Sequence, residues 1–447
     1  MEFLKKIWHT LDQNFQRNEH LLLSILQHKL QEAIHLLNSI VGKDSQLSSL
    51  DQILKKTGTL RRSKYVLRVK DSLDRTLSEL VEWRNLFDPS WYPLARVPSD
   101  EIDRNLAASS KDEALKTLAK LRKSVKDLNS DTGTPLRPIS SNDFLGPRLP
   151  ITASCSAIAQ LEGKVQYAVV DTMLVNPGMD AAGTTRSVIA LSKALSRMEP
   201  FAFGLLRCCG VINKLDSYDF VFEIPQGLQT PRSLRDLLLH SPPSLNVKLD
   251  IAKQLANSVL YLHTTGFVHK NIRPETILVF DYGEAKSSFL VGFENFRAAK
   301  DGTLKIGDSL LERELYRHPL RQGNHPEQQY VMQHDIYSLG VCLLEIGVWK
   351  SFVNVDEGKT ITEFDPPVST KDSRKRAFAI KRQILVAANE QLSQHTGERF
   401  KDVVEMCLTC LDDDSTWYQV DDKGAAEIDI GVEFIENVLL RLQEIVV

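Results

Sequence analysis

The chain lacks several features that would place a protein in a special class. Within its 447 residues no stretch reaches the ~18 uninterrupted apolar residues of a transmembrane helix. Its formal net charge is only −3, whereas a dedicated nucleic-acid binder is usually strongly basic. The opening MEFLKKIWHTLDQNFQRNEH is too polar for a secretory signal peptide. These absences favour a cytoplasmic protein and exclude nucleic acid from the expected partners.

Cysteine is scarce as well, with 6 residues in the whole chain. Cys407 and Cys410 form a CLTC pair inside an apolar, helix-like run, without a second such pair or a nearby pair of histidines. Because a structural zinc site needs about four ligands, we interpret these cysteines as reduced, buried thiols. No metal site is expected.

The composition changes twice along the chain. Residues 1–128 place apolar side chains at helical spacing, which predicts a bundle of amphipathic helices. Residues 129–150 are rich in Pro, Gly, Ser and Asp, which indicates a linker or brace. Short strand candidates follow over about 151–225, and mainly helical patterns over about 226–447.

Three motifs in the second half carry a family resemblance. HKNIRPETIL, which begins at His269, is followed by FLVGFE and then by DIYSLGV. Their order and spacing resemble those of the protein kinase superfamily, and the FEIP segment ending at Pro225 resembles the hinge between kinase lobes. The resemblance implies an α+β bilobal protein kinase-like fold over residues 151–447, preceded by an all-α helical bundle.

The kinase positions that the sequence retains are structural ones. His269 and Phe293 match the histidine and the DFG phenylalanine that stack in an internal apolar spine of the family. Asp335 matches the helix aspartate that accepts hydrogen bonds from the catalytic-loop backbone. A buried carboxylate needs such donors, because an unpaired buried charge is costly.

The nucleotide-binding positions depart from the family pattern. No GxGxxG precedes the strand AVVD, and Asp171 stands where the family has its lysine, so that a negative charge would repel phosphate. Lys164 is an alternative position for a relocated lysine. The next helical run, TTRSVIALSKALSRM, contains no glutamate to pair with either.

The catalytic positions depart too. Asn271 replaces the aspartate base, and an amide cannot take up a proton. Thr276 replaces the metal-binding asparagine, and Gly292 replaces the DFG aspartate. Arg273 matches the catalytic-loop lysine, and Glu294, two residues after Gly292, is the nearest carboxylate that could reach a metal.

Taken together, these departures predict a pseudokinase that is not an enzyme and needs no cofactor, neither ATP nor Mg²⁺. Two alternatives stay open. One is an atypical, ATP-binding protein kinase with relocated catalytic residues, and the other is a scaffold without any membrane role.

The N-terminal region carries a second resemblance. LVEWRNLFDPSWYPLAR, residues 80–96, resembles a segment of fungal HeLo-type domains, and the order of bundle, brace and pseudokinase resembles the mixed-lineage kinase-domain-like protein. The resemblance implies signalling in a cell-death or immune-type pathway, with protein partners, self-association and recruitment to an anionic membrane surface through the bundle. HeLo-type proteins begin with an apolar, glycine-containing helix, whereas MEFLKKIWHTLDQ resembles their second helix, so the first helix is expected to be lacking.

The charge of the predicted bundle fits that surface only weakly. Residues 1–128 contain 22 Lys and Arg against 17 Asp and Glu, and RRSKYVLRVK at 61–70 is the most basic patch. A solvated helix face is the alternative interpretation. Attraction to anionic lipids contributes ~1 kcal/mol per basic residue near the surface.

Overall fold

The chain is described by a computed structural model that describes most residues from 144 onward and few before 91. Apart from a few single positions, it describes residues 6–10, 91–96, 99–108, 113–128, 144–162, 167–175, 181–229, 231–283, 285–298, 310–323, 328–356, 359–364, 372–413 and 426–445. Most of the predicted bundle, the RRSKYVLRVK patch and Lys164 lie outside these residues. No helix among the described residues is long and apolar enough to cross a membrane.

The contacts divide the chain into two compact units. One comprises residues 1–91 with 99–108, and the other comprises residues 92–98 with 109–447. In the first unit the structure describes η1 (Trp8–Thr10) and α7 (Asp100–Ala108). In the second it describes α6 (Trp91–Arg96) from Tyr92 onward, α8 (Glu113–Leu128) and everything that follows. The domain boundaries taken from the sequence stay predictions.

An antiparallel sheet of five strands forms the first part of the second unit. Its strands lie in the order β1-β2-β3-β5-β4. Their bounds are β1 (Phe144–Pro150), β2 (Ser156–Leu161), β3 (Tyr167–Leu174), β4 (Arg207–Asn213) and β5 (Ser217–Glu223). β3 and β5 are central and read YAVVDTML and SYDFVFE, with β-branched and aromatic side chains that suit a strand covered on both faces.

Strand β1 begins inside the segment that the sequence assigns to a linker. Its residues FLGPRLP are mostly exposed, and Gly146 adopts a positive φ of 78°. Pro and Gly are tolerated on an edge strand, which must discourage pairing with other chains. The same two residue types made this stretch resemble a linker.

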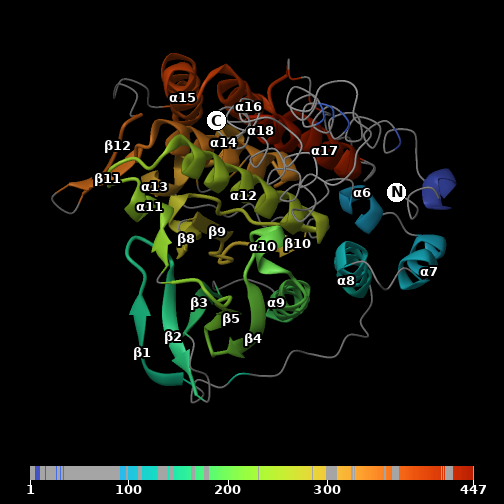
Figure 1. Ribbon diagram of the computed structural model, residues 1–447. Helices are drawn as coiled ribbons and strands as arrows, with labels where there is room; N and C mark the ends of the chain where they lie inside the picture. The colour runs from blue at the N-terminus through green and yellow to red at the C-terminus, as the bar shows by residue number, and fades with distance from the viewer. Residues whose placement is uncertain are drawn as a thin grey trace, which may run out of the picture. The chain divides into compact units, whose positions relative to one another are not determined.

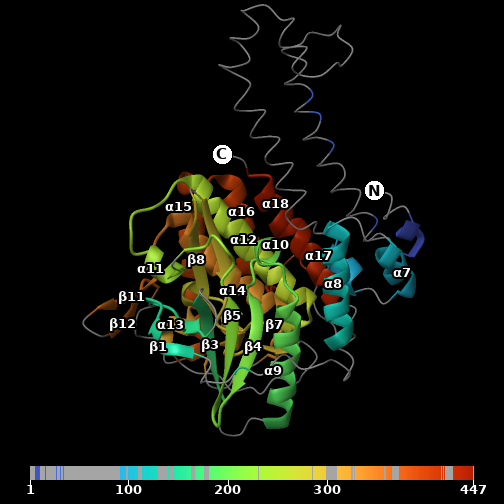
Figure 2. The same cartoon turned by 60° about the horizontal axis from the view of Figure 1, so that its bottom comes forward.

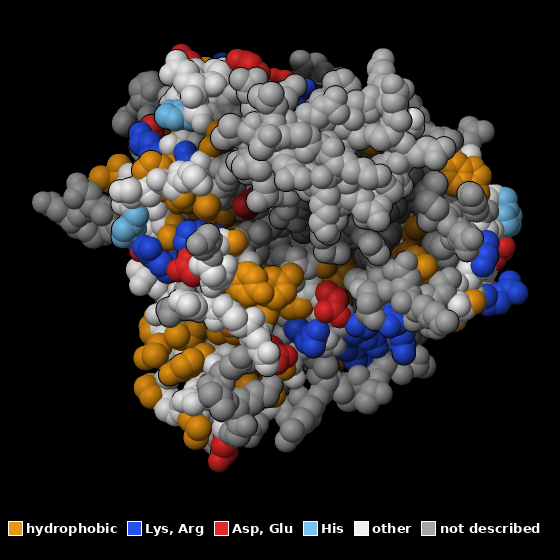
Figure 3. All heavy atoms as spheres, viewed as in Figure 1, with side chains coloured by type: hydrophobic (Ala, Val, Ile, Leu, Met, Phe, Trp, Pro, Cys, Tyr) orange, Lys and Arg blue, Asp and Glu red, His pale blue; other side chains and the backbone are white. Residues whose placement is uncertain are grey.

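One helix packs against the sheet, and a second helix packs against the first. α9 (Ala181–Ser196) packs against β4, beside which both Figure 1 and Figure 2 place it. α8 packs against α9 in turn, with Leu118 and Leu121 buried. The exposed side of α8 carries Lys116, Lys120, Lys123 and Lys126. Figure 3 shows basic side chains gathered over this helix and the neighbouring end of α9.

Helices dominate the remainder of the unit and lie above the sheet in Figure 1. They are α10 (Pro200–Phe203), α11 (Leu234–Leu237), α12 (Leu245–Thr264), α13 (Leu311–Glu314), α14 (Met332–Val348), α15 (Ser373–His395), α16 (Glu398–Thr409), α17 (Ala426–Phe434) and α18 (Leu440–Gln443), with the short helices η3 (Pro274–Thr276), η4 (Pro319–Arg321) and η5 (Ile435–Leu439). Short strands lie among them: β6 (Arg232–Ser233), β7 (Phe267–Val268), β8 (Ile277–Tyr282), β9 (Ala285–Leu290), β10 (Arg297–Ala298), β11 (Val353–Asp356) and β12 (Lys359–Thr362).

Helix α14 forms the centre of this helical part. Its sequence MQHDIYSLGVCLLEIGV is mostly apolar, and every residue from Met332 to Gly347 is buried. A largely apolar helix has to be covered on all its sides, and α12, α15 and α16 pack against it. A sheet-rich part followed by a helical part is compatible with the predicted α+β kinase-like fold.

Candidate functional site

The loop that begins at His269 is anchored by one buried carboxylate from α14. Asp335 is 0% exposed and accepts hydrogen bonds from the backbone N–H groups of His269 and Lys270, at 2.8 and 2.9 Å. The Tyr330 hydroxyl donates to it at 2.6 Å, and His263 Nε2 lies 2.9 Å from it. The structure therefore places Asp335 where the kinase resemblance expects it.

These donors decide the charge of the carboxylate. Burial alone would raise the pKa of Asp335, but the hydrogen bond and charge of His263, with the charge of His269, lower that pKa to about 2. Burial lowers the pKa of His269 to about 4, so that its imidazole is neutral. Its Nε2 bonds to the Val291 carbonyl at 2.9 Å, and its Nδ1 accepts from the Asn271 N–H at 3.3 Å. This pairing fixes one tautomer and one ring orientation.

An aromatic stack connects the loop to the sheet. The His269 and Phe293 rings lie 5.0 Å apart, and the Phe293 ring lies 5.9 Å from that of Phe222 in β5. The structure thus brings the two predicted spine residues together. Because both are buried, they serve packing between the two parts of the unit.

Asn271 and Arg273, which match the base and the catalytic-loop lysine of the family, belong to a polar cluster around Glu294. The Glu294 carboxylate accepts a hydrogen bond from Asn271 Nδ2 at 2.7 Å. It also pairs with Arg313 at 3.2 Å and, more distantly, with Arg273 at 3.7 Å. Arg273 Nε in turn donates to Asn271 Oδ1 at 3.0 Å. Asn271, Arg273 and Glu294 therefore satisfy one another.

The two positions at which the family binds metal pack against each other instead. Thr276 is fully buried, and its hydroxyl lies within 3.0 Å of the Asn271 and Arg273 carbonyls. Gly292 has a φ of +81°, and a Cβ there would lie 2.4 Å from Thr276 Cγ2 and 2.9 Å from Cys155 Sγ. This contact leaves no room for a side chain at 292.

Asp171 has a role that the sequence did not predict. It is 3% exposed, and its carboxylate accepts from the Gly292 N–H at 2.6 Å, from the Phe293 N–H and from the Ser156 hydroxyl. Burial nevertheless raises its pKa to about 6. β3 directs the carboxylate inward to these backbone N–H groups, and the repulsion of phosphate by its negative charge stays a prediction. We call this set of bonds the Asp171 clamp.

The turn between β1 and β2, residues 151–155, makes further bonds to the helical part. The Ser154 hydroxyl donates to the Glu275 carbonyl at 2.9 Å, and the Ser233 hydroxyl donates to the Thr152 carbonyl at 2.7 Å. Cys155 Sγ lies 3.8 Å from the same Glu275 carbonyl. This turn lies within the stretch where the resemblance leads one to expect a glycine-rich loop, and it bonds to Glu275 of the loop that begins at His269.

A buried ion network next to η3 was missed from the sequence. Arg235 donates to Glu275 at 3.0 Å and to Glu345 at 3.1 Å. The Tyr316 hydroxyl donates to Glu345 at 2.9 Å. Charges inside the apolar runs SLRDLLLH and GVCLLEIGVW were the available signal, since a buried charge implies a partner.

The donors present do not fit a magnesium site. Mg²⁺ requires several oxygen ligands in a near-octahedral arrangement, and Glu294 is already engaged by Asn271 and two arginines. Across the described part of the chain, no three His, Cys, Asp or Glu side chains gather closely enough to hold a metal ion. Cys407 and Cys410 are free, buried thiols.

Comparison with known proteins identifies partial relatives. No protein-family model matches the chain. A probable LIM domain-containing serine/threonine-protein kinase of Dictyostelium discoideum is 32% identical over 117 residues, which is 26% of this chain and 17% of that protein. The serine/threonine-protein kinase PknD of Protochlamydia amoebophila is 27% identical over 211 residues, 42% of this chain and 20% of its own length. The mitogen-activated protein kinase kinase mkk2 of Aspergillus fumigatus is 27% identical over 159 residues, 35% and 29% of the two lengths.

These relatives support a protein kinase-like superfamily for the chain, which spans less than a third of the length of each of the three. They also correct one prediction. The sequence predicted a protein that is not an enzyme, but relatives that are named as serine/threonine-protein kinases point to kinase activity. The prediction assumed that the chemistry needs the family's residue types at the family's positions, whereas phosphoryl transfer depends mainly on positioning and charge, which residues elsewhere can supply.

Proposed function

We propose that this chain is a protein kinase-like signalling protein whose kinase-like unit acts as an interaction and switching module. The observation that carries the proposal is the direct bonding between sheet and loop. The Asp171 clamp bonds to Gly292, and Ser154 bonds to Glu275. A ligand entering between sheet and loop has to replace these bonds, so its binding changes how the two parts are joined.

The proposed target of the switch is the N-terminal helical region, residues 1–128. Its HeLo-type resemblance supports a cell-death or immune-type pathway, with protein partners, self-association and an anionic membrane surface. The packing of α8 against α9 supports coupling between the kinase-like unit and this region, because a shift of α9 displaces its contacts with α8.

A second candidate function is that of an atypical protein kinase that binds ATP with relocated residues. The names of the partial relatives favour it. Phosphate incorporation from radiolabelled ATP into a generic protein substrate, abolished by Glu294→Gln, would establish it. Incorporation that is unchanged in this variant would instead indicate a contaminating kinase.

A thermal-shift titration with ATP, with and without MgCl₂, tests the switch. Ligand binding raises the stability of the folded state by RT ln(1 + [L]/Kd), about 2.7 kcal/mol at 100 Kd. We expect Asp171→Ala to increase the shift relative to the wild type, because it opens the clamp and removes a negative charge. Asp216→Ala, at an exposed position between β4 and β5, is the matched control and should leave the shift unchanged. The absence of a shift at millimolar ATP in wild type and Asp171→Ala alike would overturn a nucleotide-responsive switch.

A further inference from the structure

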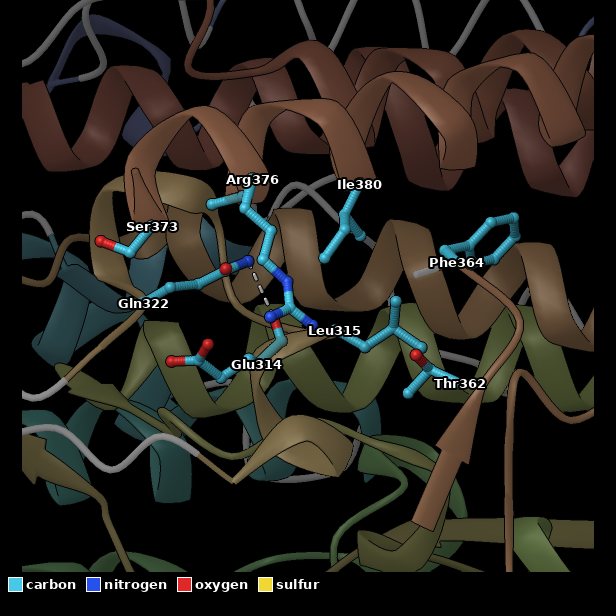
Figure 4. A pocket seen from close by; sticks show the side chains of 9 residues that line it. Glu314, Leu315, Gln322, Thr362, Phe364, Ser373, Arg376 and Ile380 are labelled. Atoms are coloured by element: carbon cyan, nitrogen blue, oxygen red, sulfur yellow. Dashed lines mark hydrogen bonds between the residues drawn. The ribbon is translucent and has the colours of Figure 1, made fainter. Parts of the chain in front are cut away.

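A pocket lies away from the Asp171 clamp, between α13, β12 and α15. Its volume is about 320 Å³. The side chains that line it are Glu314, Leu315, Gln322, Thr362, Phe364, Ser373, Arg376, Ala377 and Ile380. Figure 4 shows them converging from the two sides of the cavity. Ligand pockets begin at ~300 Å³, so this one has room for one or two large side chains.

The inner part of the pocket is apolar. Leu315, Phe364, Ala377 and Ile380 are all less than 10% exposed, yet they border the cavity. These side chains come from elements far apart in the sequence and are held by the folded helical part. An apolar surface of this kind favours a ligand with an aliphatic or aromatic body.

One polar group in the wall has no partner. Thr362 is 7% exposed, and among the described residues its Oγ1 finds no hydrogen-bond partner. Figure 4 shows this oxygen on the pocket side of β12, facing Leu315. Buried hydroxyls are nearly always hydrogen-bonded, because leaving one unpaired costs stability. The pocket therefore offers a ligand one unused hydrogen-bonding position.

The rim is basic. The first turn of α15 contains Arg374, Lys375 and Arg376, all exposed. The N-cap Asp372 accepts from the Arg374 and Lys375 N–H groups, so three cations outnumber one carboxylate at this helix end. This excess of positive charge favours an approaching anion. Arg376 reaches from α15 toward Glu314 and Leu315 on the opposite wall (Figure 4). The acid of that wall, Glu314, is bonded through Oε1 to the Gly323 N–H.

We propose that this pocket binds an acidic peptide segment of a partner protein. A large aliphatic or aromatic side chain enters between Leu315, Phe364 and Ile380, and a polar group of the peptide pairs with Thr362 Oγ1. Carboxylates on either side of the anchoring residue lie against the first turn of α15. The inference rests on the interaction role proposed above and adds the chemistry of the partner.

A peptide array tests the recognition on the full chain without nucleotide. Each peptide carries one of the twenty amino acids at its centre, flanked by Asp-Glu pairs or by Lys-Arg pairs. We expect retention of peptides with Leu, Ile, Met or Phe at the centre and acidic flanks, at least tenfold above those with central Ala or basic flanks. Equal retention of all acidic peptides would reduce the site to a charged patch and overturn the proposal. Because ATP is absent, failure here is independent of failure of the nucleotide switch.

Two variants locate the binding, each with a matched control. Thr362→Val should lower the affinity for a fluorescein-labelled acidic peptide with central Leu at least fivefold, while the midpoint of thermal unfolding stays the same or rises. Thr396 is equally buried, but its hydroxyl donates to the Leu392 carbonyl at 3.1 Å. Thr396→Val should therefore lower the midpoint and leave binding unchanged.

The charge of the rim is tested on the same helix. Arg376→Glu should lower the affinity for the labelled peptide at least tenfold. Arg382→Glu, at an exposed position of α15 outside the pocket lining, should change this affinity less than twofold. Wild-type affinity in both Thr362→Val and Arg376→Glu would place the peptide elsewhere and overturn the proposal.

Discussion

The buried acids Asp171 and Asp335 respond to pH in opposite directions, although β3 and α14 hold both against backbone N–H groups. The pKa of Asp171 is about 6 in the folded state, against an ordinary value of 3.8 for an aspartate. Its contribution to stability is complete below pH ~4 and is lost as the pH rises through ~6. At ~1.4 kcal/mol per pKa unit the loss is about 3 kcal/mol. We expect Asp171→Asn to abolish this fall between pH 4 and 6, as measured by urea denaturation at each pH.

Asp335 provides the control for this measurement. Its pKa is about 2 in the fold, so its contribution is present above pH ~4 and is lost as the pH falls toward ~2. Asp335→Asn should alter only this lower range. A fall between pH 4 and 6 that persists in Asp171→Asn would contradict the assignment to the Asp171 clamp.

Gly292 is a second residue whose importance the sequence hides. Judged by chemistry, the position has lost its metal-binding aspartate and should tolerate change. The structure gives it a φ of +81° and a contact of only 2.4 Å between an added Cβ and Thr276. We expect Gly292→Ala to lower the unfolding free energy by about 3 kcal/mol, from ~1 kcal/mol of backbone strain and ~1–3 kcal/mol of overpacking.

Gly266 separates the two causes. It has a φ of +78° but open space around an added Cβ. Gly266→Ala should therefore cost only the strain, about 1 kcal/mol. Chemical denaturation of both variants measures the difference, and equal losses would mean that the packing against Thr276 contributes nothing.

At the scale of elements, helix α14 depends on two glycines for its close packing. A Cβ at Gly340 would lie 2.7 Å from Cys407 Cβ in α16, and a Cβ at Gly347 would lie 2.4 Å from Leu392 in α15. Intrinsic helix propensity favours Ala over Gly by ~1 kcal/mol. Gly340→Ala should nevertheless destabilise the protein by ~1–3 kcal/mol, because overpacking against α16 outweighs propensity. Val386→Ala, on the exposed side of α15, is the control. A Gly340→Ala variant that is more stable than the wild type would refute the close contact between α14 and α16.

The elements also show what can be predicted from sequence. The loop at His269 and its anchor Asp335 were recognisable because motif residues lie at fixed spacing along the chain. β1 was not, because an edge strand tolerates the Pro and Gly that also mark linkers. The Asp171 clamp joins residues 121 positions apart, and the Arg235–Glu345 pair spans 110. No local pattern encodes such partners, and charges within apolar runs indicate only that partners exist.

At the scale of the molecule, the limits of the kinase-like unit decide which fragments can fold well. The unit includes α8, in which Leu118 and Leu121 are buried, and Arg122 donates a hydrogen bond to the Leu94 carbonyl of α6. A fragment of residues 129–447 lacks these contacts and exposes the covered side of α9. Since burial of a leucine contributes ~1.5–3 kcal/mol, we expect it to be about 3–6 kcal/mol less stable in urea than residues 92–447.

Substitutions in the full chain test the same packing without truncation. Leu118→Ala should cost ~2–5 kcal/mol, whereas Lys123→Ala, on the exposed side of the same helix, should change the unfolding free energy by less than about 0.5 kcal/mol. If residues 129–447 match residues 92–447 in stability and Leu118→Ala is neutral, α8 is not part of the folded unit. The proposed coupling between α9 and the N-terminal region would then lose its support, because it rests on the packing of α8, which lies within residues 1–128, against α9.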